Sequence, residues 1–509
     1  MKLDLMNTLT RRWIRVAIWA MVGALSVLRF FYLTADFPND SLWMIDQAKF
    51  TDEGWWCGAA VMHALTGHWY VAGDYNPAVA LPVWPLLVGA VFHFTGVSVV
   101  AARALNVAIS ISTLGILFAL VRRYTETETP ALLAVLLLAA SPFAFVFSRL
   151  AILDTLVVFE FCVLMLMASY ASRTRLWMLA SLAVLISAMI LTKTTAVLLV
   201  PAIGWMAWSA MERKTSALLP VGIATAALPA LLLKSYALLV SAFGYGTDYR
   251  YFFNVNAMPD IDWRQTVATL FQLLQSGFWI DRVLFPVGLT ILVVTVAWKR
   301  KLWSNPLFAA AWIAIAAQAV FIFRQQDNYA PRYFLVMLSP LIVIVALTYD
   351  QLMTHSRKMS AVLVVAMAGS VIANVVMVGQ FMTNRDYDFH NAADAIGAVI
   401  RSHPEQKALI VGVSGNQLSL MTGIPSINDG YGTEDMAEKV ARYQPGWYVA
   451  WNDVTQEDHA YLSVYKLEKV ASYPAFDDDD RGALTLYKLV KKANGSPDAF
   501  QASGSAGDR

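Results

Sequence analysis

Long apolar runs separated by short polar links dominate the chain up to about residue 385. A helix that crosses a bilayer needs about 20 predominantly apolar residues. On this criterion we expect eleven spans, near residues 13–35, 97–121, 129–148, 150–171, 176–192, 194–211, 216–241, 283–299, 305–323, 333–350 and 359–383. The pattern therefore predicts a mostly α polytopic membrane protein, with its first span retained rather than cleaved.

Residues 77–96 decide the topology, because this apolar segment is interrupted by Pro77, Pro82 and Pro85. Lys and Arg favour cytoplasmic loops. If the segment lies on the outer surface and does not span, every basic cluster between helices becomes cytoplasmic: Arg122-Arg123, Arg173-Thr174-Arg175, Glu212-Arg213-Lys214, Lys299-Arg300-Lys301 and His355-Ser356-Arg357-Lys358. We therefore expect a cytoplasmic N-terminus, an external loop with interfacial helices over residues 36–96, and an outward-facing C-terminus.

The pattern changes at about residue 386. Residues 388–401 and 434–443 read as helices, 407–413 and 447–451 as buried strands, and 482–489 as a final edge strand. This predicts a small α/β domain over residues 386–492 on the outer face. The acidic run 477–480 favours a solvated turn over a calcium loop, and the Gly/Ser-rich residues 493–509 are expected to be disordered.

Composition agrees with a membrane protein. Of 509 residues, 58% are hydrophobic and 15% charged, which excludes most soluble designs, and the net charge of +2 gives no indication of nucleic-acid binding. Cys57 and Cys162 are the only cysteines, so neither a disulfide framework nor a cysteine metal site is expected. A disulfide-free chain with compact loops fits a bacterial inner membrane.

Candidate chemistry concentrates in residues 50–76 of the external loop, which carry the adjacent acids Asp52 and Glu53, the acid Asp74 and several tryptophans. An amphipathic helix anchored at the interface by its tryptophans is the alternative reading. His63 and His68 are five apart, which does not place two zinc ligands on one helical face.

Basic residues also lie at the outer ends of predicted spans. An ionised Lys or Arg at mid-helix costs about 2.5–3.5 kcal/mol on insertion scales. Each could pair with a nearby acid such as Asp154 or Asp327, or reach the interface. Together they suggest a phosphate-binding wall formed by Arg29, Arg103, Arg149, Lys193, Lys234, Arg324 and Arg332.

These residues carry a family resemblance. Asp52-Glu53, followed by Ala60, Met62 and Gly67-His68-Trp69, resembles the first external loop of the GT-C glycosyltransferases that use polyprenyl-phosphate sugars, the superfamily of protein O-mannosyltransferases and lipid A aminoarabinose transferase. Further matching stretches follow in the family's order: Asn76-Pro77, residues 101–106, Ser141-Pro142, residues 148–154, Leu191-Thr192-Lys193 and Pro331-Arg332-Tyr333. Ala78 and Thr194 depart from the pattern, which affects the expected acceptor and lipid entrances more than the chemistry.

The resemblance implies a GT-C fold and inverting transfer of a sugar to a lipid, glycan or protein acceptor outside the membrane. A phosphate leaving group needs no general acid, unlike glycoside hydrolysis. Asp52 is expected to be the general base. Glu53 would hold the loop or the acceptor, and a divalent metal is possible but not expected. The other expected site residues are Lys193, Arg332 and Arg149 for the donor phosphate, and Asp154, Trp69, Asp74 and Tyr333 for the substrates.

Two other classes remain open. Charged groups in a bundle also mark the pathway of a lipid-linked sugar flippase or transporter. Inverted repeats with paired broken helices are the usual sign of a transporter, and the sequence shows neither. A catalytically inactive scaffold that binds a partner is the third reading, and the presence of both Asp52 and Lys193 argues against it.

Overall fold

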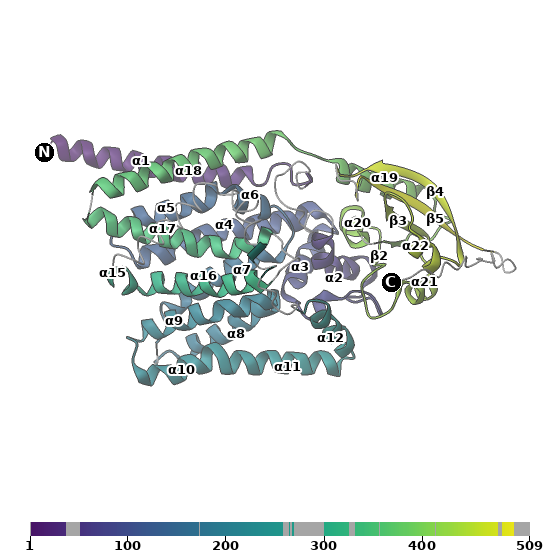
Figure 1. The fold of residues 1–509 in the computed structure, drawn as a ribbon, viewed down its shortest axis with the longest axis horizontal. Helices are drawn as coiled ribbons and strands as arrows, with labels where there is room; N and C mark the ends of the chain where they lie inside the picture. The colour runs from purple at the N-terminus through teal and green to yellow at the C-terminus, as the bar shows by residue number, and fades with distance from the viewer. Residues whose placement is uncertain are drawn as a thin grey trace.

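The protein has two parts arranged end to end along its long axis, a helical bundle and a small sheet domain (Figure 1). The computed structural model describes residues 2–36, 51–172, 174–257, 264, 267–268, 300–324, 331–355, 357–412, 414–476 and 481–492. The predicted span 283–299, Asp327, the acidic run 477–480 and the tail 493–509 lie outside the described residues.

The first half of the bundle contains α1 (Lys2–Leu28), α2 (Asp52–Thr66), η2 (Pro77–Val79), α3 (Val83–Thr95), α4 (Val99–Arg123), α5 (Thr129–Ala140), α6 (Pro142–Phe147), α7 (Leu153–Ala168), α8 (Leu176–Thr192), η3 (Thr194–Leu199), α9 (Val200–Ala210) and η4 (Thr215–Ala217). It continues with α10 (Leu218–Gly222), η5 (Ile223–Ala227), α11 (Leu228–Ala242), α12 (Gly246–Val255), α15 (Arg300–Trp303), α16 (Pro306–Arg324), η8 (Pro331–Phe334), α17 (Leu335–His355) and α18 (Arg357–Thr383).

Most predicted spans correspond to helices of the bundle. Within the described ranges, five helical stretches are long and apolar enough to cross a membrane, and four apolar stretches are shorter. The predicted span 194–211 begins as the 3-10 helix η3, and the span 216–241 contains the π-helix η5. The multi-pass prediction is confirmed, and the count of eleven spans stays a prediction.

Helix α3 occupies the segment that decides the topology. Its 13 residues extend roughly 20 Å, which is short of the ~30 Å hydrocarbon core of a bilayer. Helices α2, α3 and α12 lie between the bundle and the sheet domain (Figure 1). The expectation that residues 77–96 do not span stays a prediction.

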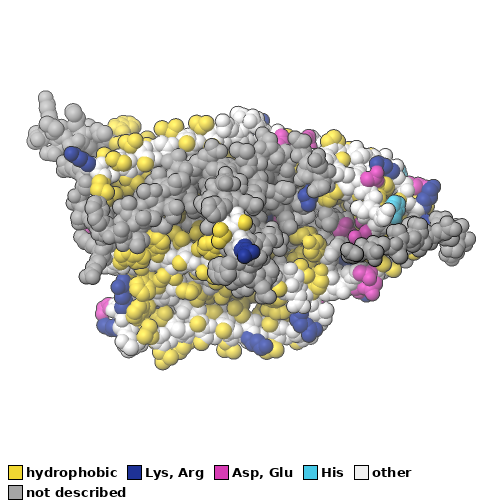
Figure 2. Space-filling view, viewed as in Figure 1, with side chains coloured by type: hydrophobic (Ala, Val, Ile, Leu, Met, Phe, Trp, Pro, Cys, Tyr) yellow, Lys and Arg dark blue, Asp and Glu magenta, His cyan; other side chains and the backbone are white. Residues whose placement is uncertain are grey.

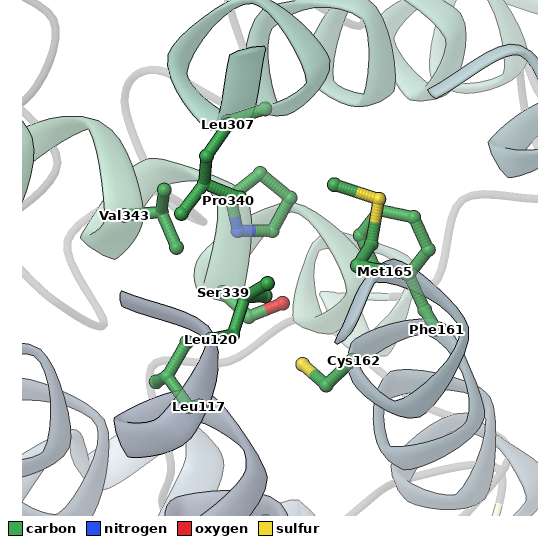
Figure 3. Close-up of a pocket in the computed structure, with 10 residues that line it drawn as sticks. Leu117, Leu120, Phe161, Cys162, Met165, Leu307, Ser339, Pro340 and Val343 are labelled. Atoms are coloured by element: carbon green, nitrogen blue, oxygen red, sulfur yellow. The ribbon is translucent and has the colours of Figure 1, made fainter. Parts of the chain in front are cut away.

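The centre of the bundle is packed with apolar side chains. Helix α5 is apolar on all sides and ten of its residues are buried, as expected for a helix enclosed by others. Elsewhere in the bundle, α4, α7, α16 and α17 leave a small apolar pocket at Cys162, Ser339 and Pro340 (Figure 3). Its volume of about 10 Å³ holds at most one water molecule, so it is a packing void rather than a substrate site.

Figure 2 shows hydrophobic side chains over much of the described flank of the bundle, whereas Asp and Glu gather mainly over the C-terminal domain. This domain contains α19 (Asp388–Ser402), β1 (Ile410–Val411), α20 (Gly415–Thr422), β2 (Ser426–Ile427), α21 (Met436–Tyr443), β3 (Trp447–Trp451), α22 (Gln456–Tyr461), β4 (Tyr465–Pro474) and β5 (Ala483–Lys491). The predicted α/β character of this domain agrees with these elements.

The strand order is β2-β1-β3-β5-β4, with β1 parallel to β2 and β3, and β5 antiparallel to β3 and β4. The prediction that the last strand lies at an edge is wrong, because β4 pairs along nearly all of β5. Strand β4 escaped prediction because its burial does not alternate regularly, so it lacks a clear period of two.

Candidate active site

The first turn of α2 carries the two adjacent acids. Thr51 precedes the helix, and its hydroxyl lies 3.5 Å from an Asp52 carboxylate oxygen. Acidic side chains in a first turn interact favourably with the positive end of the helix dipole. Asp52 and Glu53 are both almost fully buried, so each needs a partner inside the protein.

Glu53 has its partner in Arg103 of α4. The Arg103 guanidinium donates from Nε to Oε1 at 2.8 Å and from Nη2 to Oε2 at 2.6 Å. Its remaining Nη1 donates to the carbonyls of Leu33 and Ala35, and the Ala151 amide donates to Glu53 at 2.7 Å. A two-pronged Arg–carboxylate contact is strong and directional. Of the two expected roles for Glu53, this geometry fits holding the loop.

Gln417 of α20 brings the C-terminal domain into the same contact. Its side-chain oxygen accepts from the Gly54 amide at 2.7 Å, and its side-chain nitrogen donates to Glu53 at 3.2 Å. A Cβ at Gly54 would lie 2.2 Å from the Gln417 backbone nitrogen. The absence of a side chain at Gly54 therefore permits the approach of α20 to α2.

Asp52 lies in a cluster of alternating charges contributed by distant elements. Lys193 follows the last residue of α8 and donates to Asp154, in the first turn of α7, at 2.6 Å. Arg332 of η8 forms an ion pair with Asp52, and its Nε lies 3.8 Å from Asp154. Two carboxylates and two cations thus meet at the end of the bundle that carries α2.

Tyr333 lies beside both cations. The Lys193 ammonium is 4.7 Å from the centre of the Tyr333 ring, and the Arg332 guanidinium is 5.5 Å from it. Cations are attracted to the face of an aromatic ring. Of the expected substrate-binding residues, Tyr333 and Asp154 are therefore brought together with Asp52.

Burial changes the protonation of Asp52. Its removal from water, and then the negative charge of Asp154, raise its pKa to about 7, while the positive charge of Lys193 opposes the shift. A carboxyl group with a pKa near 7 is suited to accept a proton at neutral pH.

Three expected site residues lie elsewhere. Arg149 donates to the carbonyls of Phe31 and Tyr32 at 2.7 and 2.8 Å, so it holds the turn after α1. Asp74 accepts from Lys439 at 3.3 Å and from the Asn428 amide, which joins the external loop to the C-terminal domain. These contacts provide a structural reason for the burial of both groups.

Trp69 is the third. Its ring stacks on His63, with ring centres 4.3 Å apart. A Cβ at Gly89 of α3 would lie 2.6 Å from the same ring. Trp69 therefore packs α3 against the end of α2.

Several features next to Asp52 were not expected from the sequence. Arg103 was expected as a basic helix-end residue and within the matching stretch of residues 101–106, but its pairing with Glu53 was not expected. Gln417 carries no local signal, since it lies 364 positions from Glu53. Tyr75 and Tyr431 were not singled out either. Their rings meet that of Trp55, one of the tryptophans of the external loop, beside the start of α2, with centres 5.1 to 5.7 Å apart.

Comparison with known proteins supports the family resemblance. Residues 77–248 match the model of the family described as dolichyl-phosphate-mannose-protein mannosyltransferase. No curated protein matches the chain by sequence. The matched segment includes α3, Asp154 and Lys193.

Solved structures share the fold over nearly the whole chain. ArnT from Cupriavidus metallidurans bound to undecaprenyl phosphate matches with a TM-score of 0.60 and 13% identity, over 92% of this chain and 97% of ArnT. The apo form of ArnT matches with a TM-score of 0.61 and 15% identity, over 94% of this chain and 98% of ArnT. A third match is the oligosaccharyltransferase AglB from Archaeoglobus fulgidus, in complex with an inhibitory peptide and a dolichol-phosphate. Its TM-score is 0.53 and its identity 12%, over 96% of this chain and 75% of AglB. The predicted GT-C fold is confirmed, and the expected enzyme class, a GT-C glycosyltransferase, agrees with both comparisons.

Proposed function

We propose that the protein is a membrane glycosyltransferase that moves a sugar from a polyprenyl phosphate to an acceptor at the extracytoplasmic face. The observation that carries this proposal is the cluster of Asp52, Asp154, Lys193 and Arg332 at one end of the bundle. ArnT and AglB, which share the fold, are described as binding undecaprenyl phosphate and a dolichol-phosphate. A lipid phosphate is therefore the donor chemistry that we assign to this cluster.

The two cations would hold the donor phosphate. In the structure each is neutralised by a carboxylate, Lys193 by Asp154 and Arg332 by Asp52. A phosphodiester is an anion that competes for the same donors, and charge-assisted hydrogen bonds to it are strong. When Arg332 turns to the phosphate, the Asp52 carboxylate loses its partner and becomes available as a base.

The reaction then needs one displacement. An acceptor hydroxyl attacks the anomeric carbon while its proton passes to Asp52, and the bond between that carbon and the phosphate oxygen breaks. The polyprenyl monophosphate leaves with the bonding electron pair, and Lys193 and Arg332 stabilise its growing negative charge. Attack from the side opposite the phosphate inverts the anomeric centre.

The remaining residues would hold this arrangement in place. Arg103 fixes the first turn of α2 through Glu53, and Gln417 fixes it through the Gly54 amide. A base must lie within hydrogen-bond reach of the proton that it removes. These two contacts with the first turn of α2 therefore serve the position of Asp52.

We further propose a bacterial inner membrane with the C-terminal domain in the periplasm. The positive-inside distribution of the basic clusters supports this orientation. The cluster of Asp52 and Lys193 lies at the end of the bundle that carries this domain, so both substrates would meet outside the cytoplasm.

Transfer in proteoliposomes tests the function. The purified chain would be given polyprenyl phosphates that carry radiolabelled sugars, together with membrane extract from a deletion strain as the source of acceptors. We expect label to reach an acceptor with the wild-type chain and not with Asp52→Asn. Label that only crosses between leaflets would instead identify a flippase, and no movement of label with any donor would contradict both readings.

A further inference from the structure

A cavity of about 360 Å³ lies between the C-terminal domain and the start of α2, outside the ion-pair cluster. This volume is within the range of about 300–1,000 Å³ that small-molecule sites occupy. Asp429 follows β2 directly after Asn428, and Trp451 and Asp453 lie at the end of β3. Both strands are parallel to β1, and open α/β sheets bind ligands at the carboxyl ends of such strands.

The lining combines rings with hydrogen-bonding groups. Four aromatic side chains contribute to it: Trp55, Tyr431, Tyr448 and Trp451. Three carboxylates, Asp429, Asp453 and Asp458, outnumber the single guanidinium of Arg481. Ionised carboxylates accept hydrogen bonds only, so the cavity favours a ligand rich in hydroxyl donors and disfavours an anion.

The carboxylates are held in fixed orientations. Thr455 donates to Asp458 from its hydroxyl at 2.8 Å and from its amide at 2.9 Å, and the Tyr448 hydroxyl also bonds to Asp458. The Tyr487 hydroxyl donates to Asp453. Asp429 accepts from the Gly430 amide at 2.6 Å, and burial raises its pKa to about 6. Preorganised acceptors of this kind lose little entropy when a ligand binds.

The cavity is continuous with the residues around Asp52. Thr51 lines the cavity, and its hydroxyl lies 3.5 Å from a carboxylate oxygen of Asp52. Trp55 lines it as well, and residues three apart share one face of a helix. A ligand in the cavity therefore lies against the same face of α2 that begins with Asp52.

We propose that this cavity binds a sugar ring of the acceptor, oriented so that one hydroxyl points toward Asp52. The rings would pack on the apolar faces of the sugar, and the carboxylates would accept from its hydroxyls. The proposal rests on the proposed glycosyltransferase function, and it names the acceptor as a glycan or a glycolipid headgroup. A cationic peptide is the other ligand that carboxylates and aromatic rings could accept.

Binding can be measured without catalysis. The full chain in nanodiscs would be given maltotriose, cellotriose or chitotriose, with trilysine and glucose 6-phosphate as comparison ligands, and contact would be detected by saturation-transfer NMR. We expect at least one oligosaccharide to bind, and Asp429→Asn to weaken its binding by about tenfold because a charge-assisted hydrogen bond is lost. Tyr448→Phe, which changes only a hydroxyl, should weaken the same contact.

Glu457→Gln is the matched control, because Glu457 lies on α22, is exposed, bonds to Tyr461 and does not line the cavity. It should leave binding unchanged. Binding of trilysine alone, no binding of any oligosaccharide, or binding unaffected by both cavity variants would overturn the proposal. Measuring undecaprenyl phosphate binding on the same samples tests the proposed donor site separately from the proposed acceptor site. If the lipid binds and Lys193→Met weakens it while no sugar binds, the acceptor site is wrong and the donor site stands.

Discussion

Lys193 and Asp154 lie 2.6 Å apart between Nζ and a carboxylate oxygen, although 39 positions separate them in the chain. The contact joins the end of α8 to the start of α7, and Arg332 extends it to Asp52. Pairing with Asp154 was one of the alternatives to a phosphate-binding wall for the basic residues. The structure contains that pairing, and a donor phosphate would have to displace it.

Asp52→Asn should lower kcat by roughly 10²- to 10⁴-fold, since that is the usual contribution of a general base. The amide keeps the shape of the side chain but cannot accept the acceptor's proton. The measurement is sugar transfer in proteoliposomes, with undecaprenyl phosphate binding as a control that should be retained. A variant with more than a third of wild-type kcat would exclude Asp52 as the base.

The activity should depend on pH through Asp52. Because its pKa is raised to about 7, kcat/KM should rise as pH increases through about 7, where the carboxylate becomes ionised. Stability should change in the opposite direction. The contribution of a carboxyl with a raised pKa is fully present below the ordinary pKa of 3.8 and is lost as pH rises from there to about 7. A flat profile of kcat/KM between pH 5.5 and 8.5 would contradict the assignment.

Lys193→Met should destabilise the protein by about 3–5 kcal/mol at most, because it leaves Asp154 buried and, of its ion pairs with described residues, keeps only the longer contact to Arg332. Lys193→Met combined with Asp154→Asn should recover much of the lost stability, since no buried charge is left without its partner. Neither variant should bind undecaprenyl phosphate normally. Thermal unfolding in detergent and lipid binding measure the two effects separately, and recovery of lipid binding in the double variant would exclude Lys193 as a phosphate ligand.

Gly54→Ala should separate α2 from the C-terminal domain, because the added Cβ would lie 2.2 Å from the Gln417 backbone. Overpacking of this kind costs about 1–3 kcal/mol. Gly58→Ala on the same helix is the control, since its Cβ meets only the Asn416 side chain, at 3.3 Å. Thermal unfolding and transfer activity should both fall for Gly54→Ala, and an equal effect of the two substitutions would show that this close contact is unimportant.

EDTA should leave the transfer activity unchanged. Lys193 and Arg332 already provide positive charge beside Asp52, and charged side chains can stabilise a leaving phosphate without a metal ion. The measurement is the initial rate with and without EDTA, followed by addition of Mg²⁺ or Mn²⁺. A rate that falls with EDTA and returns with either ion would show that a metal is required.

Helices could be predicted from the sequence where charged residues flank an apolar run. Helix α8 covers Leu176–Thr192, as the apolar run predicts, since Arg175 and Lys193 flank it. Strand β4 could not be predicted, because its buried and exposed residues do not alternate regularly. Periodicity detects elements with one buried face, and β4 has none that is continuous.

The candidate site could be predicted in part of its membership, but its pairings could not. Family motifs indicated Asp52, Lys193 and Arg332, and the structure brings all three together. The ion pair of Glu53 with Arg103 and the contact of Gln417 with Gly54 depend on packing between distant segments. No local pattern encodes such contacts, which is also why Asp74 looked like a substrate ligand although it pairs with Lys439.

The contact between Gly54 and Gln417 joins positions 363 residues apart, which has a consequence for translation. When α2 leaves the ribosome, the segment that will cover its first turn has not yet been synthesised. Asp52 and Glu53 must therefore pass through membrane insertion before the segment that covers the first turn of α2 has been made. The reaction centre can reach its finished form only after nearly the whole polypeptide has been made.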